Sequence, residues 1–150
     1  MNKLKKTVFG VLAGLTLALG AAGTGHAAAE PNSVFLNPGV CLTPNHYLQA
    51  GYNQLAFQND GNIVAKWQGS PAYQFPNTWG QATRFCMQAD GNLVAYGNQN
   101  QVLWALNQVD GNRYYAGDVL AVQTDGNLVV YRDYGNGDVL WTTNTYHPGF

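Results

Sequence analysis

Three segments of the 150-residue chain repeat one order of side chains, Gln-x-Asp-Gly-Asn-x-Val, in which the polar residues keep a fixed spacing. The copies begin at Gln58, Gln88 and Gln123, so they lie 30 residues (58 to 88) and 35 residues (88 to 123) apart. The polar residues that follow are Asp60 and Asn62, Asp90 and Asn92, and Asp125 and Asn127. One carboxylate beside two amides offers hydrogen-bond acceptors and donors close together. This chemistry suits an uncharged ligand that is rich in hydroxyl groups, such as a sugar.

Two more positions complete each copy. A valine stands two residues after the asparagine (Val64, Val94 and Val129), and a tyrosine follows two residues later in the second and third copies (Tyr96 and Tyr131). The first copy has Lys66 where the others have tyrosine. Lysine brings a mobile charge and loses more side-chain entropy when it is ordered. We therefore expect two complete sites and a degenerate first site.

The Asp-Gly pair between apolar runs predicts a β-hairpin in each copy. A three-residue loop that ends in a left-handed glycine would pair Gln123 with Asn127, and Val122 with Leu128. Because side chains alternate across a strand, this register separates an apolar face from a polar face, whereas a two-residue loop would mix glutamine with the apolar set. The apolar sets are Leu55, Phe57, Ile63 and Ala65; Phe85, Met87, Leu93 and Ala95; and Leu120, Val122, Leu128 and Val130.

Hairpins of this size do not fold alone, so the three should turn their apolar faces inward around a pseudo-threefold axis. A tryptophan follows each copy (Trp79, Trp104 and Trp141), and we expect all three at or near the centre. From Glu30 onward no segment has a convincing helical period. The sequence thus predicts an all-β domain of three small antiparallel sheets. Residues 108–114 repeat the first half of the motif, and we expect them to form a connecting loop.

The N-terminus has the pattern of a secretory signal peptide. Three lysines within the first six residues precede an uncharged run from Thr7 to Gly25 that is rich in Leu, Ala, Val and Gly. We predict a leader over residues 1–29, cleaved after Ala27 or Ala29, and a mature domain over residues 30–150. An uncleaved membrane anchor is the alternative, although Gly and Thr interrupt the run. The prediction is therefore a secreted, extracellular protein without stable membrane insertion.

The charge of the chain limits the classes of partner that it can bind, and its cysteine content predicts a disulfide. From Glu30 onward four basic residues stand against eight acidic ones, a net charge of −4, and the basic residues are scattered. Nucleic acid is not an expected partner, because its binding needs clustered positive charge. Export through an oxidising route favours a disulfide between Cys41 and Cys86. Two free thiols and a metal site are the alternatives, and no histidine or further cysteine stands at ligand spacing from either residue.

The triplicate motif, with its tyrosines and trailing tryptophans, resembles the mannose-binding signature of the monocot, or bulb-type (snowdrop-like), lectins. The resemblance spans Leu42 to Thr145. It implies a type II β-prism with one sugar pocket in each sheet and no cofactor or metal, in which Gln, Asp, Asn and Tyr bond mannose hydroxyls and Val packs on the ring. These roles would fall to Gln88, Asp90, Asn92, Val94 and Tyr96, and to Gln123, Asp125, Asn127, Val129 and Tyr131, with Gln58, Asp60, Asn62, Val64 and Lys66 as the degenerate site.

The resemblance also bears on role and partners. Bacterial members of the family include lectin-like bacteriocins, so the expected partners are mannose-containing glycans or a bacterial surface polysaccharide. The oligomeric state stays open between a monomer and a homodimer. The family's usual cysteines stand at somewhat different positions from Cys41 and Cys86.

Three other classes of function compete with a metal-free lectin. A secreted glycoside hydrolase needs paired carboxylates, and each copy offers one acid, so we predict no enzyme activity. A calcium lectin needs about 6 to 8 oxygen ligands and several carboxylates per site. A structural interaction protein would use the Asp-Gly-Asn segments as turns alone, yet turns do not require the Gln and the Val that accompany them in every copy.

Overall fold

Three antiparallel sheets of four strands each make up the protein in a computed structural model that describes residues 28–109 and 114–149. Most of the predicted leader, residues 1–27, lies outside the described residues, as do residues 110–113 of the predicted connecting loop. The predicted all-β fold is confirmed. In the described part of the chain, no helix is long and apolar enough to cross a membrane.

Each sheet carries one copy of the motif, and we number the sheets after the copies. The first sheet contains β3 (His46–Ala50), β4 (Asn53–Phe57), β5 (Ile63–Trp67) and β6 (Ser70–Gln74). The second contains β2 (Val40–Leu42), β7 (Arg84–Met87), β8 (Leu93–Tyr96) and β9 (Val102–Ala105). The third contains β1 (Val34–Leu36), β10 (Val119–Val122), β11 (Leu128–Tyr131) and β12 (Val139–Thr142). Short 3-10 turns follow β8, β9 and β11 at Asn98–Asn100, Leu106–Gln108 and Asp133–Gly135.

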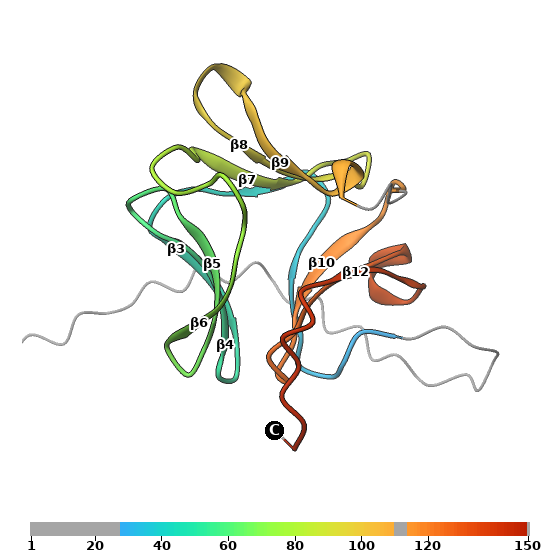
Figure 1. The fold of residues 1–150 in the computed structure, drawn as a ribbon. Helices are drawn as coiled ribbons and strands as arrows, with labels where there is room; N and C mark the ends of the chain where they lie inside the picture. Colours follow the sequence, from blue (N-terminus) through green and yellow to red (C-terminus); the bar gives the residue numbers. More distant parts are fainter. Residues whose placement is uncertain (1–27, 110–113, 150) are drawn as a thin grey trace, which may run out of the picture.

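The outer strands β1, β2 and β3 tie the sheets together. These consecutive strands pair with the hairpins of the third, the second and the first sheet in turn, so one short segment of chain visits all three sheets. Figure 1 shows the resulting prism, with the second sheet at the top, the first at the lower left and the third at the lower right. The residues that precede β1 therefore lie next to the third sheet, far in sequence from its hairpin.

The hairpins adopt the predicted register. Val122 is paired with Leu128, Phe57 with Ile63 and Met87 with Leu93. In each loop the glutamine N–H donates to the asparagine carbonyl, and the glycine has a positive φ of 83°, 93° or 96° at Gly61, Gly91 and Gly126. A Cβ at Gly91 would stand 1.8 Å from the carbonyl oxygen of Tyr115, so glycine is required there by both backbone angle and space. The three-residue loop is confirmed.

The predicted apolar faces meet in one core. All twelve residues of the three apolar sets are buried in the same cluster. At the centre Phe75 packs between Trp104 and Trp141, with ring centroids 5.0 and 6.0 Å away. Trp104 and Trp141 themselves lie 5.6 Å apart. Burial of these faces is the main stabilisation of a fold whose sheets are each too small to persist alone.

The prediction for the third tryptophan is wrong, because Trp79 is 73% exposed. Register explains the difference: Trp104 is paired with Ala95 and Trp141 with Val130, and the residue paired with the corresponding Ala65 is Tyr73. Tyr73 packs edge-on against Trp141 at 5.9 Å. Tyr73 is therefore the third aromatic of the pseudo-threefold set, and Trp79 stands in the loop that follows β6.

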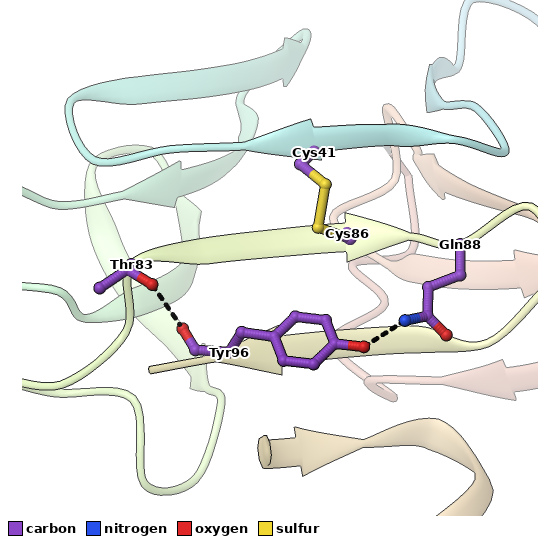
Figure 2. Close-up of a disulfide and its surroundings, with 5 residues drawn as sticks. All are labelled: Cys41, Thr83, Cys86, Gln88 and Tyr96. Atoms are coloured by element: carbon purple, nitrogen blue, oxygen red, sulfur yellow. Dashed lines mark hydrogen bonds between the residues drawn. A yellow bond between two sulfur atoms is a disulfide. The ribbon is translucent and has the colours of Figure 1, made fainter. Parts of the chain in front are cut away.

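Cys41 and Cys86 form the predicted disulfide. The two residues are cross-strand partners on β2 and β7, so the bond fastens the outer strand of the second sheet to its hairpin (Figure 2). Both side chains belong to the outer face of that sheet, because their neighbours Leu42 and Phe85 point into the core.

Candidate functional site

The motif side chains gather on the outer face of each hairpin, opposite the core. At the tip, the aspartate Oδ1 accepts the backbone N–H of the asparagine two residues later, at 2.9 Å in all three copies. This bond leaves the second carboxylate oxygen of Asp60, Asp90 and Asp125 for another partner. Each copy thus presents one carboxylate oxygen at a fixed place beside the glutamine and the asparagine.

The asparagine side chains are oriented by the end of the last strand of each sheet or by the segment that follows it. The Oδ1 of Asn92 accepts the N–H of Asn107 at 3.2 Å, and the Oδ1 of Asn127 accepts the Thr142 hydroxyl at 2.7 Å. In the first copy the hydroxyl of Thr78 donates to Asn62 at 3.4 Å. Since the amide oxygen is occupied, the amide nitrogen is the group left to donate outward.

The second site is an open hollow of about 450 Å³. Gln88 Nε2 donates to the Tyr96 hydroxyl, and Figure 2 shows the tyrosine ring reaching along β8 toward Gln88. Asp90 is exposed, Gln88 and Tyr96 are half-buried, and Val94 lies on the floor of the sheet. The hollow is also lined by Gly39, Cys41, Arg84 and Cys86. Of the five predicted residues of the second copy, Gln88, Asp90 and Tyr96 therefore line an accessible hollow, whereas Asn92 and Val94 are buried, with 7% and 2% of their surface exposed.

The first site is open as well but lacks the tyrosine. A hollow of about 560 Å³ lies beside Gln58 and Asp60, bounded by Asn45 and Tyr47 of the neighbouring strand region. Lys66 occupies the tyrosine position and is paired with Gln54 on β4. The tyrosine hydroxyl that orients Gln88 in the second site has no counterpart here.

The third site has the complete set of side chains, yet it is covered. Gln123 donates to the Tyr131 hydroxyl at 2.7 Å, as in the second copy. However, Gln123 is 2% exposed, Asp125 6% and Tyr131 5%. Ala29 and Phe35 pack against a cluster that contains Val129 and Tyr131. The predicted residues are together, but Ala29 of the segment before β1 and the Phe35 side chain of β1 pack against them.

Hydrogen bonds hold this covering segment in place. The N–H of Ala29 donates to the carbonyl of Gly135 at 2.9 Å, and Ser33 closes a turn onto the carbonyl of Glu30. The Glu30 carboxyl is hydrogen-bonded to Asp125 and to the Thr124 side chain. Burial, then the charge of Asp125 and the hydrogen bond with it, raise the pKa of Glu30 above its ordinary value. The Glu30 carboxyl of the chain itself thus interacts with Asp125, the aspartate of the third site.

Sequence reasoning missed several residues that shape these sites. Thr78 and Thr143 are buried, and each accepts the N–H of the residue after the motif asparagine, Ile63 or Leu128. Both stand 15 residues after that partner, a second period that the sequence does contain. Arg84 and the cover of the third site carry no such repeat signal.

The chain is similar in sequence and in structure to known lectins. It is 35% identical to a mannose-specific lectin of Aloe arborescens over 107 residues, which are 69% of this chain and 90% of that one. Among solved structures, a monomeric monocot mannose-binding lectin of Gastrodia elata has a TM-score of 0.63 and 30% identity, covering 75% of this chain and 97% of its own.

The snowdrop (Galanthus nivalis) mannose-specific agglutinin, solved with methyl-α-D-mannoside, has a TM-score of 0.55 and 30% identity, covering 75% of this chain and 96% of its own. No protein-family model matches the chain. The relative from Aloe is matched over nine-tenths of its length, and the solved lectins share the three-sheet prism. The chain therefore belongs to the bulb-type mannose-binding lectin family.

Proposed function

We propose that this protein is a secreted lectin that binds mannose residues of glycans without a metal ion and without catalysis. The observation that carries the proposal is the second site, where Gln88, Asp90 and Tyr96 line an open hollow and the buried Asn92 and Val94 belong to the same hairpin. The relative from Aloe arborescens is named as mannose-specific, and the snowdrop agglutinin was solved with a mannoside. Both support mannose as the ligand.

The hydrogen bonds within the second site define what it offers a sugar. Asp90 has one free carboxylate oxygen, and Asn92 has a free amide nitrogen. Because Gln88 donates to the Tyr96 oxygen, the tyrosine hydroxyl hydrogen and the glutamine Oε1 face outward. Two acceptors and two donors at fixed places match neighbouring sugar hydroxyls, and an epimer leaves one of them unpaired. Val94 supplies an apolar contact for the C–H face of the ring.

The hydrogen-bonding groups of the sites also support binding without a metal ion. Each copy of the motif contributes one carboxylate, whose Oδ1 already accepts a backbone N–H. Calcium takes about 6 to 8 oxygen ligands, which this donor set does not provide. The protein groups would therefore contact the sugar hydroxyls directly.

The three sites contribute unequally in this proposal. The second site binds mannose in the folded chain, and the first binds weakly because Lys66 replaces the tyrosine. The third binds only when the cover that the mature domain retains, Glu30 and Phe35, leaves it. Affinity for a single mannose would be weak, on the order of millimolar. Several weak sites on one rigid prism can still bind a polymer tightly through effective concentration.

The test is a titration of ¹⁵N-labelled protein with methyl-α-D-mannoside, followed by NMR. The backbone amide of Asn92 reports on the second site and that of Asn127 on the third. We expect the Asn92 signal to shift with the sugar, equally before and after a chelator, and methyl-α-D-galactoside to leave it unmoved. No shift at any motif residue would refute a mannose lectin, and a shift abolished by the chelator would indicate a metal-dependent one.

For the biological role, we propose a bacteriocin-like protein that recognises a surface polysaccharide of related bacterial strains. The proposal is supported by the lectin fold, by the predicted signal peptide and by the resemblance to lectin-like bacteriocins. Purified protein spotted on lawns of related and unrelated bacteria should inhibit some strains, and the Asp90→Ala variant should not. Absence of inhibition on every lawn, with sugar binding intact, would leave a lectin without this role.

A further inference from the structure

Arg84 places a positive charge at the second site, at the end away from the Asp90 tip. It is the cross-strand partner of Tyr96, and its guanidinium carbon lies 4.2 Å from the centre of the tyrosine ring. The same ring bears the hydroxyl that contacts Gln88. Arg84 also lines the hollow of about 450 Å³. The guanidinium therefore borders the space in which the motif would hold a sugar.

This charge is particular to the second sheet. The residue that pairs with the corresponding motif position is Gln54 on the first sheet and Val119 on the third. Neither carries a charge, so the repeat itself does not require a cation at this place. Stacking on a tyrosine explains where the guanidinium rests but leaves its N–H donors unused.

Within residues 28–109 and 114–149, no ion pair neutralises the charge of Arg84. Three basic residues that follow Glu30 lie in the described part of the protein: Lys66, Arg84 and Arg132. Arg132 lies 3.7 Å from Asp138, an ion pair, whereas among the described residues no ion pair forms at Arg84. A guanidinium with free donors, held by a ring at the edge of a hollow, matches a carboxylate or phosphate through two parallel hydrogen bonds.

We propose that the second site prefers acidic saccharides, in which a mannose-like ring carries, or is linked to a unit that carries, a carboxylate or phosphate group bound by Arg84. This proposal rests on the proposed lectin function and names its ligand class. The anionic group would lie at the Tyr96 end of the site. Arg84 begins β7 and Gln88 directly follows its last residue, so the two are about 13 Å apart at the usual rise and the anion stays away from the Asp90 carboxylate.

The experiment compares methyl-α-D-mannoside with two acidic probes, mannose 6-phosphate and methyl mannuronoside, by NMR titration at low salt. We expect each acidic probe that reaches Arg84 to bind about tenfold more tightly than the neutral mannoside, and the ratio to fall as salt screens the charge. The two probes distinguish a phosphate from a carboxylate source. In Arg84→Gln the ratio of acidic to neutral affinity should fall to about one.

Arg132→Gln is the matched control, because it removes the same charge from a residue outside the sites, and its affinity ratio should equal that of the unaltered protein. Equal affinity for neutral and acidic probes would overturn this proposal and leave the lectin function standing. A preference that survives in Arg84→Gln would also overturn it. Failure of every probe to bind would refute the lectin function itself.

Discussion

The second and third sites contain the same five side chains, yet one is open and the other is closed. In the cross-strand row of the motif valine, separated from it by Cys86 or Ala121 of the intervening strand, the outer strand carries Cys41 in the second sheet and Phe35 in the third. Cys41 is held back against β7 by the disulfide, whereas Phe35 packs over the third site together with Ala29. A complete motif is therefore not sufficient for an accessible pocket, because the neighbouring strand decides what stands above it.

The first prediction concerns the bond that shapes the open site. Replacing both Cys41 and Cys86 by alanine should lower the free energy of unfolding by about 2 to 4 kcal/mol, since the bond constrains the unfolded chain. The release of β2 should also weaken mannoside binding at the second site. Urea unfolding and NMR titration measure the two effects. Unchanged stability and binding would show that strand pairing alone holds β2.

The second prediction separates the two sites by equivalent substitutions. Asp90→Ala should weaken the affinity for the mannoside at least tenfold, because a hydrogen bond to a charged group contributes about 1.5 to 3 kcal/mol. The matched control is Asp125→Ala. Its affinity for the mannoside should be nearly that of the unaltered chain, since Asp125 is covered. Calorimetric titration with methyl-α-D-mannoside measures both. Equal losses in the two variants would mean that the third site also binds.

The third prediction opens the closed site. A chain that begins at Pro31 and carries Phe35→Ala loses the cover formed by Ala29, Glu30 and the phenyl ring. The Asn127 amide should then shift with mannoside, as that of Asn92 does. The control is the same truncated chain with Asp125→Ala, in which the new shift should vanish. If the Asn127 amide signal does not shift with mannoside in the opened chain, burial is not what keeps the third site from binding.

The smallest expected effect is a pH dependence of the cover. Glu30 faces Asp125, Thr124 and Tyr131, and its pKa is raised by burial and by Asp125. The stabilisation that Glu30 gives to the closed cover is thus fully present below the ordinary pKa of 4.5. It is lost as the pH rises through the raised pKa of Glu30. Sugar binding at the third site should accordingly increase with pH, and Glu30→Gln should flatten the profile. A third site that opens as pH falls would contradict this sign.

The sequence predicted the parts of the fold that depend on neighbours in the chain. Each loop is built within a few residues, so the Asp-Gly turn and the alternation of side chains were enough to give the register of Gln123 and Asn127. The same alternation placed Leu120, Val122 and their counterparts in the core. The prediction for Trp79 failed for the opposite reason: all three sheets share a bulge at this position, and only the pairing of β5 with β6 shows that Tyr73 is the residue opposite Ala65.

By itself the sequence determined three hairpins, their inner and outer faces, the residues of each motif and the pairing of two cysteines. Only the tertiary structure decided which motif is exposed, because Phe35 and Glu30 meet the third hairpin across about ninety positions of chain and no local pattern encodes that contact. Arg84 is a similar case, since only its pairing with Tyr96 shows that its charge borders a site. Local turn chemistry and alternation build the repeated unit, and long-range packing distinguishes one copy from another.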